Sequence, residues 1–478
     1  MGAELQCMPC DTFWPPADPK PGVGATVVAY ADGAGTASGS SLWHWGTRCG
    51  RIVTPPMEAP RGLRGSVQCA AMGASFAVAV RSDGAVVSWG CSRHGALGLG
   101  AGRLCVRALA PGTVRPAARG EPIVAVSAGL RHVLALTGSG RLLAWGGNAA
   151  GQLGVGDGKP RFRPALVEGL QELVQAVASR NMSFAVSGRG QVFAWGDNAG
   201  DALALGSGNQ CELSPSLMSS LGSTAVSRLE VTGGSGAAEK EHLVIAHAGA
   251  PWKEVSGANL KESDAEFRID MGFWLWGTWG TRHFAAPCRP WVRGRPESAR
   301  EEQKLRKVVA AGEYFVVLME DGCLFAWGRS EEGCLGLGDR MVSSVALPLV
   351  LPPGPEGAEA GCAVDLQHGR RHLLALSEHG RVYSWGDGRL GQLGLTCTRP
   401  AFEPTLVSEL ASHRVSQILA VRDASYALAD CGSVFAWGDN ADDALGLPKG
   451  EGFGLRTVLA PVKMAGFRGG RITRLEVQ

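Results

Sequence analysis

Short apolar runs separated by polar turns follow one another along most of this 478-residue chain. From Val67 a run VQCAAMG is followed by SFAVAVRSDG and AVVSWG, and the same order recurs from Ile123, Leu173, Lys307, Val364 and Val415. Short apolar runs bounded by Gly, Asp and Ser are typical of β-strands, and a dipeptide such as Asp83-Gly84 is typical of a tight hairpin. The pattern therefore predicts repeated units of three or four short antiparallel strands.

A Trp-Gly pair ends one strand of every unit, as in RLLAWGGNAAGQLGVG and LFAWGRSEEGCLGLG. Most steps between these pairs are near 50 residues, which indicates a repeat architecture. We expect an all-β, single-ring β-propeller of four-stranded blades, seven- or eight-bladed, with eight favoured by the number of units that carry a Trp-Gly pair. The tryptophans would form the structural core of the repeats, filling the space between blades while each Gly allows close backbone approach. They are Trp45, Trp89, Trp145, Trp195, Trp276, Trp327, Trp385 and Trp437.

The two ends of the chain predict how the ring closes. Residues 1–24 are rich in Pro and predict a flexible arm, and residues 25–478 then form the propeller. RITRLEVQ at Arg471–Gln478 has the pattern of a first strand with nothing after it, whereas the strands from Thr26 lack a first strand. We expect these segments to pair, which removes a free sheet edge. A charged stretch, Arg295–Lys307, suggests a short helix before the next strand, with a solvated connector as the alternative.

Composition narrows the class of protein. A net charge of +2 with 19% charged residues gives no strong electrostatic footprint for nucleic acid. No apolar run is long enough to span a membrane, and no secretory or transit pattern begins the chain. The 13 cysteines are scattered, and the single CxxC at Cys7–Cys10 has no second ligand pair nearby. We expect a soluble intracellular monomer, cytoplasmic or nuclear, with no metal and no cofactor.

No catalytic motif is present in the sequence: there is no Gly-x-Ser-x-Gly, no His-Glu-x-x-His and no phosphate loop. Three histidines recur at one position of the unit, where other units carry an aromatic residue. A position that accepts either type indicates packing rather than metal binding or base catalysis. The histidines are His132, His242 and His372, and the aromatic residues are Phe76, Phe184, Phe315 and Tyr426.

One unit departs from the others. Its second and third strands are separated by Ala250–Met271, whereas most units use two to four residues there. A long charged loop in an economical ring is typical of a functional or a disordered segment. Aromatic residues amid charge are typical of binding anchors, so this insertion is the candidate partner-binding site, with a solvated loop as the alternative. Its candidate residues are Trp252, Lys253, Glu254, Lys261, Asp264, Phe267 and Arg268.

The repeat resembles that of the regulator of chromosome condensation family, A-G-x-x-H-x-x-A-L-x-x-x-G-x-[VL]-[YF]-x-W-G-x-N-x-x-G-Q-L-G. Ala128–Gly154 and His368–Gly394 follow it almost throughout, and the resemblance extends over about residues 25 to 478. The family is typically seven-bladed, whereas this chain has eight Trp-Gly units.

The resemblance implies three kinds of activity. The first is guanine-nucleotide exchange on a small GTPase, although the chromatin-binding basic tail of the founding member is replaced here by a net negative one. The second is ultraviolet-B perception, which uses Gly-Trp-Arg-His-Thr motifs; Leu130 and Arg370 stand where those motifs have Trp. The third is a general protein-interaction scaffold. We favour the scaffold, with exchange activity as the alternative and photoreception as the least favoured.

Overall fold

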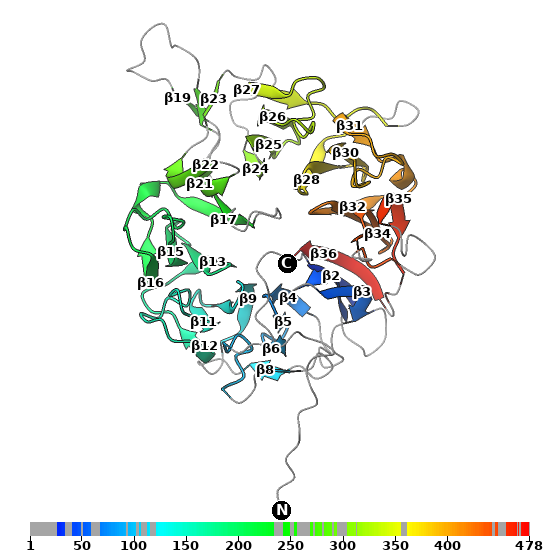
Figure 1. Cartoon of the computed structure of the whole chain (residues 1–478). Helices are drawn as coiled ribbons and strands as arrows, with labels where there is room; N and C mark the ends of the chain where they lie inside the picture. Colours follow the sequence, from blue (N-terminus) through cyan, green and yellow to red (C-terminus); the bar gives the residue numbers. More distant parts are fainter. Residues whose placement is uncertain are drawn as a thin grey trace, which may run out of the picture.

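The computed structural model is a ring of small antiparallel sheets around a central opening (Figure 1). It describes residues 26–33, 41–48, 51–58, 67–91, 94–101, 105–106, 112–114, 121–233, 242–248, 253–255, 268–270, 273–279, 282–288, 291–293, 304–311, 313–354, 361–441, 445–447, 456–465, 467 and 470–477. The arm predicted at residues 1–24 lies outside these residues. Within them, eight sheets are arranged as the blades of a propeller. The predicted fold class is therefore confirmed, with the higher blade count.

We number the blades along the chain. Blade 1 consists of β1 (Thr26–Gly33), β2 (Ser41–Arg48), β3 (Arg51–Glu58) and β36 (Gly470–Val477). Blade 2 has β4 (Val67–Met72), β5 (Phe76–Arg81), β6 (Val86–Cys91), β7 (Cys105–Val106) and β8 (Gly112–Val114). Blade 3 has β9 (Ile123–Ala128), β10 (His132–Thr137), β11 (Leu142–Gly146) and β12 (Arg161–Leu166). Blade 4 has β13 (Leu173–Ser179), β14 (Met182–Ser187), β15 (Val192–Asp197) and β16 (Cys211–Leu217).

The second half of the ring follows the same plan. Blade 5 has β17 (Val226–Gly233), β18 (His242–Ala248), β21 (Phe273–Trp279) and β22 (Arg282–Cys288). Blade 6 has β24 (Leu305–Ala311), β25 (Glu313–Met319), β26 (Leu324–Arg329) and β27 (Val342–Leu349). Blade 7 has β28 (Ala363–His368), β29 (His372–Ser377), β30 (Val382–Gly386) and β31 (Ala401–Leu406). Blade 8 has β32 (Val415–Val421), β33 (Ala424–Ala429), β34 (Val434–Asp439) and β35 (Thr457–Lys463).

Every Trp-Gly tryptophan lies on the third strand of its blade, counted outward from the opening. The first strands, such as β13 and β28, lie nearest the opening in Figure 1, and the fourth strands lie at the rim. The hydrophobic core is divided among the junctions, because each apolar cluster is shared by neighbouring blades; the cluster around Trp145 also contains Phe76 and Val78 of blade 2. Stacking blades thus buries both faces of each sheet.

The predicted pairing of the two chain ends is present. β1 is hydrogen-bonded antiparallel to β36, with Val27 opposite Val477 and Ala29 opposite Leu475. The chain therefore supplies blade 1 from both of its ends, and β1 has no unpaired edge on that side.

The helix predicted over Arg295–Lys307 is wrong where the structure describes it. Leu305–Lys307 begins strand β24, paired with β25, and Lys304 precedes it in extended chain. The preceding residues 295–303 lie outside the described part. Leu305 and Lys307 lie opposite Met319 and Leu318 of the apolar second strand, and this pairing outweighs the local propensity of a charged stretch. The described residues contain no α-helix, only 3-10 turns such as η2 (Ser219–Leu221) and η5 (Ser408–Leu410).

Candidate partner-binding surface

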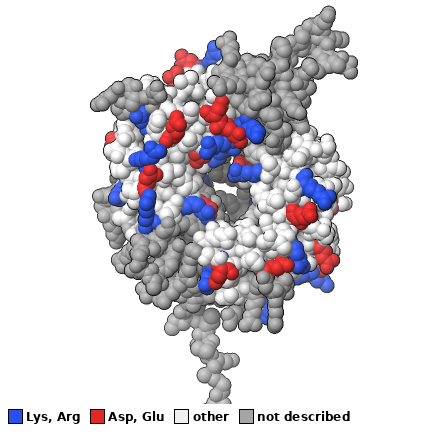
Figure 2. Space-filling model, turned by 180° about the vertical axis from the view of Figure 1, so that it is seen from behind, with Lys and Arg blue, Asp and Glu red and all other residues white. Residues whose placement is uncertain are grey.

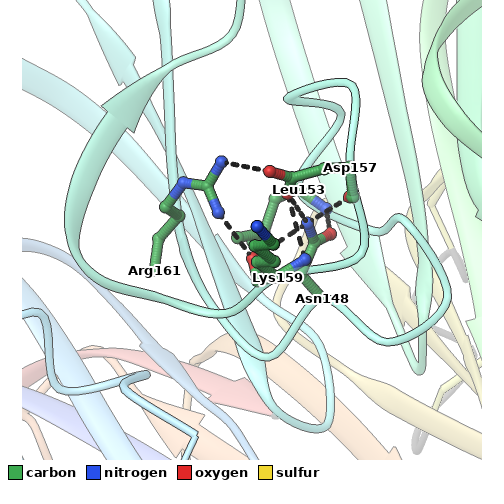
Figure 3. Close-up of polar contacts among 5 residues, drawn as sticks. All are labelled: Asn148, Leu153, Asp157, Lys159 and Arg161. Atoms are coloured by element: carbon green, nitrogen blue, oxygen red, sulfur yellow. Dashed lines mark hydrogen bonds and ion pairs between the residues drawn. The ribbon is translucent and has the colours of Figure 1, made fainter.

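The loop that follows each Trp-Gly pair is built around a buried side chain. In blade 3, Gly146 has a φ of 109°, and a Cβ there would lie 2.4 Å from the Arg131 carbonyl oxygen. Only Gly tolerates both conditions, so the strand ends and the loop turns away. Asn148, 1% exposed, then accepts a hydrogen bond from the Leu153 amide through Oδ1 (2.9 Å). Its Nδ2 donates to the Asp157 and Lys159 carbonyl oxygens, as Figure 3 shows.

An ion pair stabilises the C-terminal end of the same loop. Arg161 Nη2 lies 2.9 Å from Asp157 Oδ2, and Arg161 Nη1 donates to the Lys159 carbonyl oxygen at 2.8 Å (Figure 3). The pKa of Asp157 is held below its usual value, chiefly by hydrogen bonds from Arg161 and from the Lys159 amide. Asn198 and Asn440 bind the loops of blades 4 and 8 in the same way, through Leu203 and Leu445. These loops are therefore preformed surfaces on a fixed frame.

His132 and His372, each the first residue of a buried second strand, link one blade to the next. His132 Nε2 lies 2.9 Å from Ser183 Oγ of blade 4, and Ser183 Oγ donates to the Gln152 carbonyl oxygen. The Trp195 indole N–H donates to that same oxygen at 3.0 Å. At the junction of blades 7 and 8 the same contacts recur; the residues are His372, Ser425, Gln392 and Trp437. Each set pairs a buried imidazole Nε2, a serine hydroxyl and an indole N–H at its junction.

Both histidines are held in the neutral form. Complete burial lowers the pKa of His132 and of His372 to about 3. Gly129 precedes His132 by three residues because a Cβ there would lie 2.4 Å from the imidazole Cε1 and 2.5 Å from the Arg180 carbonyl oxygen. The Gly-x-x-His spacing of the repeat is thus required by packing.

The sequence assigned the neighbours of these histidines wrongly. In blades 2 to 8, one residue of the second strand lies directly opposite the glycine of the Trp-Gly pair. These residues are Phe76, His132, Met182, Leu243, Tyr314, His372 and Ala424. Phe184, Phe315, Tyr426 and His242 therefore lie one or two residues away from the position predicted for them. The first-to-second-strand loops differ in length, which shifts the register. The inference of a packing role holds, but His132 and His372 also form polar links between blades.

Polar side chains near the opening add further links that the sequence did not indicate. Gln175 on β13 donates to the Leu229 carbonyl oxygen and accepts from the Leu229 amide, both at 2.8 Å. Lys307 Nζ lies 3.1 Å from Asp365 Oδ1, between blades 6 and 7. Figure 2 shows acidic and basic side chains interspersed around the opening on the face in view. Gln175, Lys307 and Asp365 occupy the same position, directly after the β-bulge of their first strands. An alignment of the first strands of all blades could therefore have found them from sequence.

The insertion in blade 5 contributes two strands to a small sheet outside the blades. β18 ends at Ala248 and β21 begins at Phe273, so the long connection is present as predicted. Within it, β19 (Lys253–Val255) pairs with β20 (Arg268–Asp270). β20 also pairs with β23 (Trp291–Arg293), which follows β22 and lies outside the insertion. Figure 1 shows this sheet outside the ring, beyond blade 5 and beside β27.

The structure brings part of the predicted binding set together. Backbone pairing places Lys253 opposite Asp270 and Glu254 opposite Ile269, with Arg268 at the other end of the same short strand pair. Trp252, Lys261, Asp264 and Phe267 lie outside the described residues. The role of the set therefore stays a prediction.

The described residues hold no group of three or more His, Cys, Asp or Glu side chains arranged to bind a metal ion. No helix among them is long and apolar enough to cross a membrane.

Comparison with known proteins identifies the repeat. A family model described as the regulator of chromosome condensation (RCC1) repeat matches residues 83–136, 139–186, 321–376 and 379–428, and a second model of that description matches residues 123–152 and 364–392. This chain carries RCC1 repeats. The matched segments fall within blades 2–4 and 6–8, where the loops, histidines and Trp-Gly strands described above lie.

Other proteins are similar to parts of this chain or to most of it. The Arabidopsis thaliana RCC1 domain-containing protein RUG3, mitochondrial, is 33% identical over 29% of this chain and 30% of its own length. The Arabidopsis thaliana ultraviolet-B receptor UVR8 is 25% identical over 78% of this chain and 77% of its own length. The crystal structure of human WBSCR16 superposes with a TM-score of 0.52 at 19% identity, over 85% of this chain and 99% of that one. This chain thus spans less than a third of the first relative, and the likeness to WBSCR16 shows the propeller fold.

Proposed function

We propose that this RCC1-repeat propeller is a protein-interaction scaffold and that the insertion Ala250–Met271 is a partner-binding element. The observation that carries the proposal is the sheet formed by β19, β20 and β23, which is added outside an otherwise economical ring. Added structure on a fixed frame is a common way for a fold to acquire a binding site. The described residues hold no metal-binding cluster, and the buried His132 and His372 bond to neighbouring blades instead of facing solvent.

The test replaces Ala250–Met271 by a short Gly/Ser turn in the full chain. The melting temperature should change little, because the ring's apolar clusters lie inside the blades, while capture of protein partners in affinity purification should fall. Replacing the hairpin Gly188–Gly190 by the same turn is the matched control, since it alters a second-to-third-strand connection without an insertion. Recovery of the same partners in the same yield from both variants would remove the insertion from consideration.

Guanine-nucleotide exchange is an arm of the same test. Nucleotide release from a panel of small GTPases would be measured with the intact chain and with the shortened variant. Acceleration by the intact chain that the shortened variant loses would make the scaffold an exchange factor. Acceleration by both would place exchange on the ring itself.

A further inference from the structure

Four junctions between blades share two hydrogen bonds on the loop face, the face of the ring on which the loops after the Trp-Gly pairs lie. In the first, the Trp indole N–H of one blade donates to a carbonyl oxygen in the loop of the blade before it. The donors are Trp145, Trp195, Trp385 and Trp437, and the acceptors are Ala96, Gln152, Cys334 and Gln392. In the second, a loop amide donates to a carbonyl oxygen of the next blade's fourth strand. The pairs are Gly100 with Phe162, Gly156 with Leu213, Gly338 with Phe402, and Thr396 with Leu459.

Among the described residues, the junction between blades 4 and 5 has neither bond. Trp276 of blade 5 is fully buried, yet its indole nitrogen finds no hydrogen-bond partner in the part of the chain that the structure describes. The Gly206 amide of blade 4 corresponds to the amides of Gly100 and Gly156. It donates to Asp201 Oδ1 of its own loop, at 3.2 Å, instead of to the next blade.

The buried polar link between blades is also replaced at this junction. Met182 of blade 4 occupies the position that His132 has in blade 3, opposite the glycine of the Trp-Gly pair. Val244 of blade 5 occupies the position that Ser183 has in blade 4, opposite the tryptophan. Two apolar side chains therefore stand where the junction between blades 3 and 4 has a histidine–serine hydrogen bond.

Two extra Cβ atoms explain the missing loop-face bonds. Blades 2, 3, 6 and 7 have Gly-x-Leu-Gly in this loop, with Ala, Gln or Cys at x, whereas blade 4 has Asp201–Ala204, read as Asp-Ala-Leu-Ala. In blade 3, a Cβ on Gly154 would lie 2.7 Å from Trp195 Nε1, and a Cβ on Gly151 would lie 2.6 Å from a carbonyl oxygen of blade 4. Atoms in a packed interior do not approach so closely. The loop of blade 4 therefore keeps the indole of blade 5 out of bonding distance.

Blade 4 keeps these residues at a conformational cost. Asp201 and Ala204 have φ of 58° and 53°, in the left-handed region that glycine adopts with the least strain. A Cβ on Gly206 would meet no atom within 4 Å, whereas a Cβ on Gly156, its counterpart in blade 3, would meet Ser214 of the next blade. Strain that persists at two positions of one loop, and that removes bonds instead of adding them, indicates a use for the separation.

The same junction is bonded at its other edges. Gln175 of β13 donates to the Leu229 carbonyl oxygen of β17 and accepts from the Leu229 amide, both at 2.8 Å. Gln417 forms the same pair of bonds with Leu475 between blades 8 and 1. On the face opposite the loops, the Val226 amide at the start of β17 donates to a carbonyl oxygen in the turn between β14 and β15. Blade 5 is thus attached to blade 4 at the opening and on the face opposite the loops.

Blade 5 also has no long loop toward blade 6. Two residues separate β21 from β22, whereas fourteen separate β11 from β12 in blade 3. A connection of two residues is too short to form the loop that joins blade 3 to blade 4. Blade 5 is therefore the blade with the fewest constraints on the loop face at both of its junctions.

We propose that the junction between blades 4 and 5 is a hinge, at which blade 5 tilts away from the blade 4 loop. The bonds of Gln175 and Val226 form the axis, and the loop face is the side that opens. Blades 2 to 4 stay together, because they keep both loop-face bonds. Blade 5 carries the insertion, so the tilt reorients the insertion relative to blades 2 to 4. The hinge goes beyond the scaffold function and operates without a partner.

The test measures how often the loop face opens. Ala202→Cys places a thiol in the blade 4 loop, at the position where blade 6 has the buried Cys334, so a thiol fits there. Ala96→Cys is the matched control in blade 2, because Ala96 is also buried but its carbonyl oxygen bonds to Trp145. Each full-length variant would be alkylated with iodoacetamide under native conditions. Peptide mass spectrometry would give the rate at the introduced thiol, divided by the rate in the denatured chain.

Alkylation of Ala202→Cys should be about tenfold faster than that of Ala96→Cys, or more. The two missing hydrogen bonds lower the free energy of local opening, and the rate follows the population of the open form. Equal rates in the two variants would overturn the proposal.

A further pair of substitutions closes the hinge. Asp201→Gly and Ala204→Gly, added to Ala202→Cys, give blade 4 the Gly-Cys-Leu-Gly sequence of blade 6 and let the Trp276 indole approach the loop. Alkylation should then slow toward the rate of Ala96→Cys. The melting temperature should stay the same or rise, because glycine relieves both left-handed residues. The proposal is also overturned if the two glycines do not slow alkylation. These measurements need no partner, so loss of the partner-binding role of the insertion would leave the hinge standing.

Discussion

The junction between blades 3 and 4 and the junction between blades 7 and 8 share their buried bonds and differ at their rims. Inside, each joins a histidine to a serine and a tryptophan to a glutamine carbonyl oxygen. At the rim, Asp423 and Asp387 of one junction correspond to Asn181 and Gly147 of the other. The buried bonds are the same at both junctions, whereas the rim residues differ in charge. The comparison therefore separates contacts that both junctions share from positions at which they vary.

We expect the largest loss of stability from removal of β36, the strand of blade 1 that corresponds in sequence to β17 of blade 5. Deleting residues 470–478 leaves β1 without its neighbour and exposes the cluster that contains Ile472 and Leu475. We expect the melting temperature to fall by about 5 °C or more, or the protein to aggregate. Calorimetry of the truncated chain measures this. Gln417→Leu, which removes only the side-chain bonds to Leu475, is the milder control, and an unchanged melt after truncation would show that the ends contribute nothing.

Replacing His132 or His372 by Ala should lower the free energy of unfolding by a similar amount. His132→Ala and His372→Ala each leave a cavity at a fully buried position and remove the bond to Ser183 or Ser425. We expect each to lower the free energy of unfolding by about 2–4 kcal/mol in chemical denaturation. His132→Phe should cost less, because blade 2 has Phe76 at that position. A large difference between the two Ala variants would contradict the equivalence of the junctions.

The same histidines should make stability depend on pH. Each has a folded-state pKa of about 3, so the unfolded chain, with a histidine pKa of about 6.5, binds protons more readily. Their contribution is complete above the unfolded value and is lost progressively as the pH falls from there toward 3. Melting curves between pH 7 and pH 5 should therefore decline less steeply for the double variant His132→Phe/His372→Phe than for the wild-type chain. Parallel declines would show that other groups govern the acid response.

The smallest expected effect is at the rim. Burial raises the pKa of Asp423, so its charged form is less favourable in the folded chain than in the unfolded one. Asp423→Asn, which copies Asn181, should therefore raise the melting temperature slightly at neutral pH and lose that advantage below the usual pKa of an aspartate. Asn181→Asp is the reciprocal variant. A clear loss of stability in Asp423→Asn would mean that Asp423 is required for the fold, and the rim could not then be read as free to change.

Much of the fold could be predicted because the same pattern of strands recurs in every repeat. Trp89, Trp145 and Trp385 each lie on the third strand of a blade, and the residues around them follow the same apolar pattern. The position of Phe184 could not be predicted correctly, since it depends on a loop only two residues long before β14. The contrast between Asn181 and Asp423 needed the structure as well, because charge at a rim has no periodicity and becomes visible only when junctions are superposed.

The pairing of β1 with β36 has a consequence for synthesis. As the chain leaves the ribosome, each of blades 3 and 4 has all its strands close together in sequence and can form early. Val27 has to wait for Val477, so blade 1 is both the first to be synthesised and the last to be completed. Until then the edge of β1 is available to strands of other chains, so a half-made protein is exposed to aggregation at this edge.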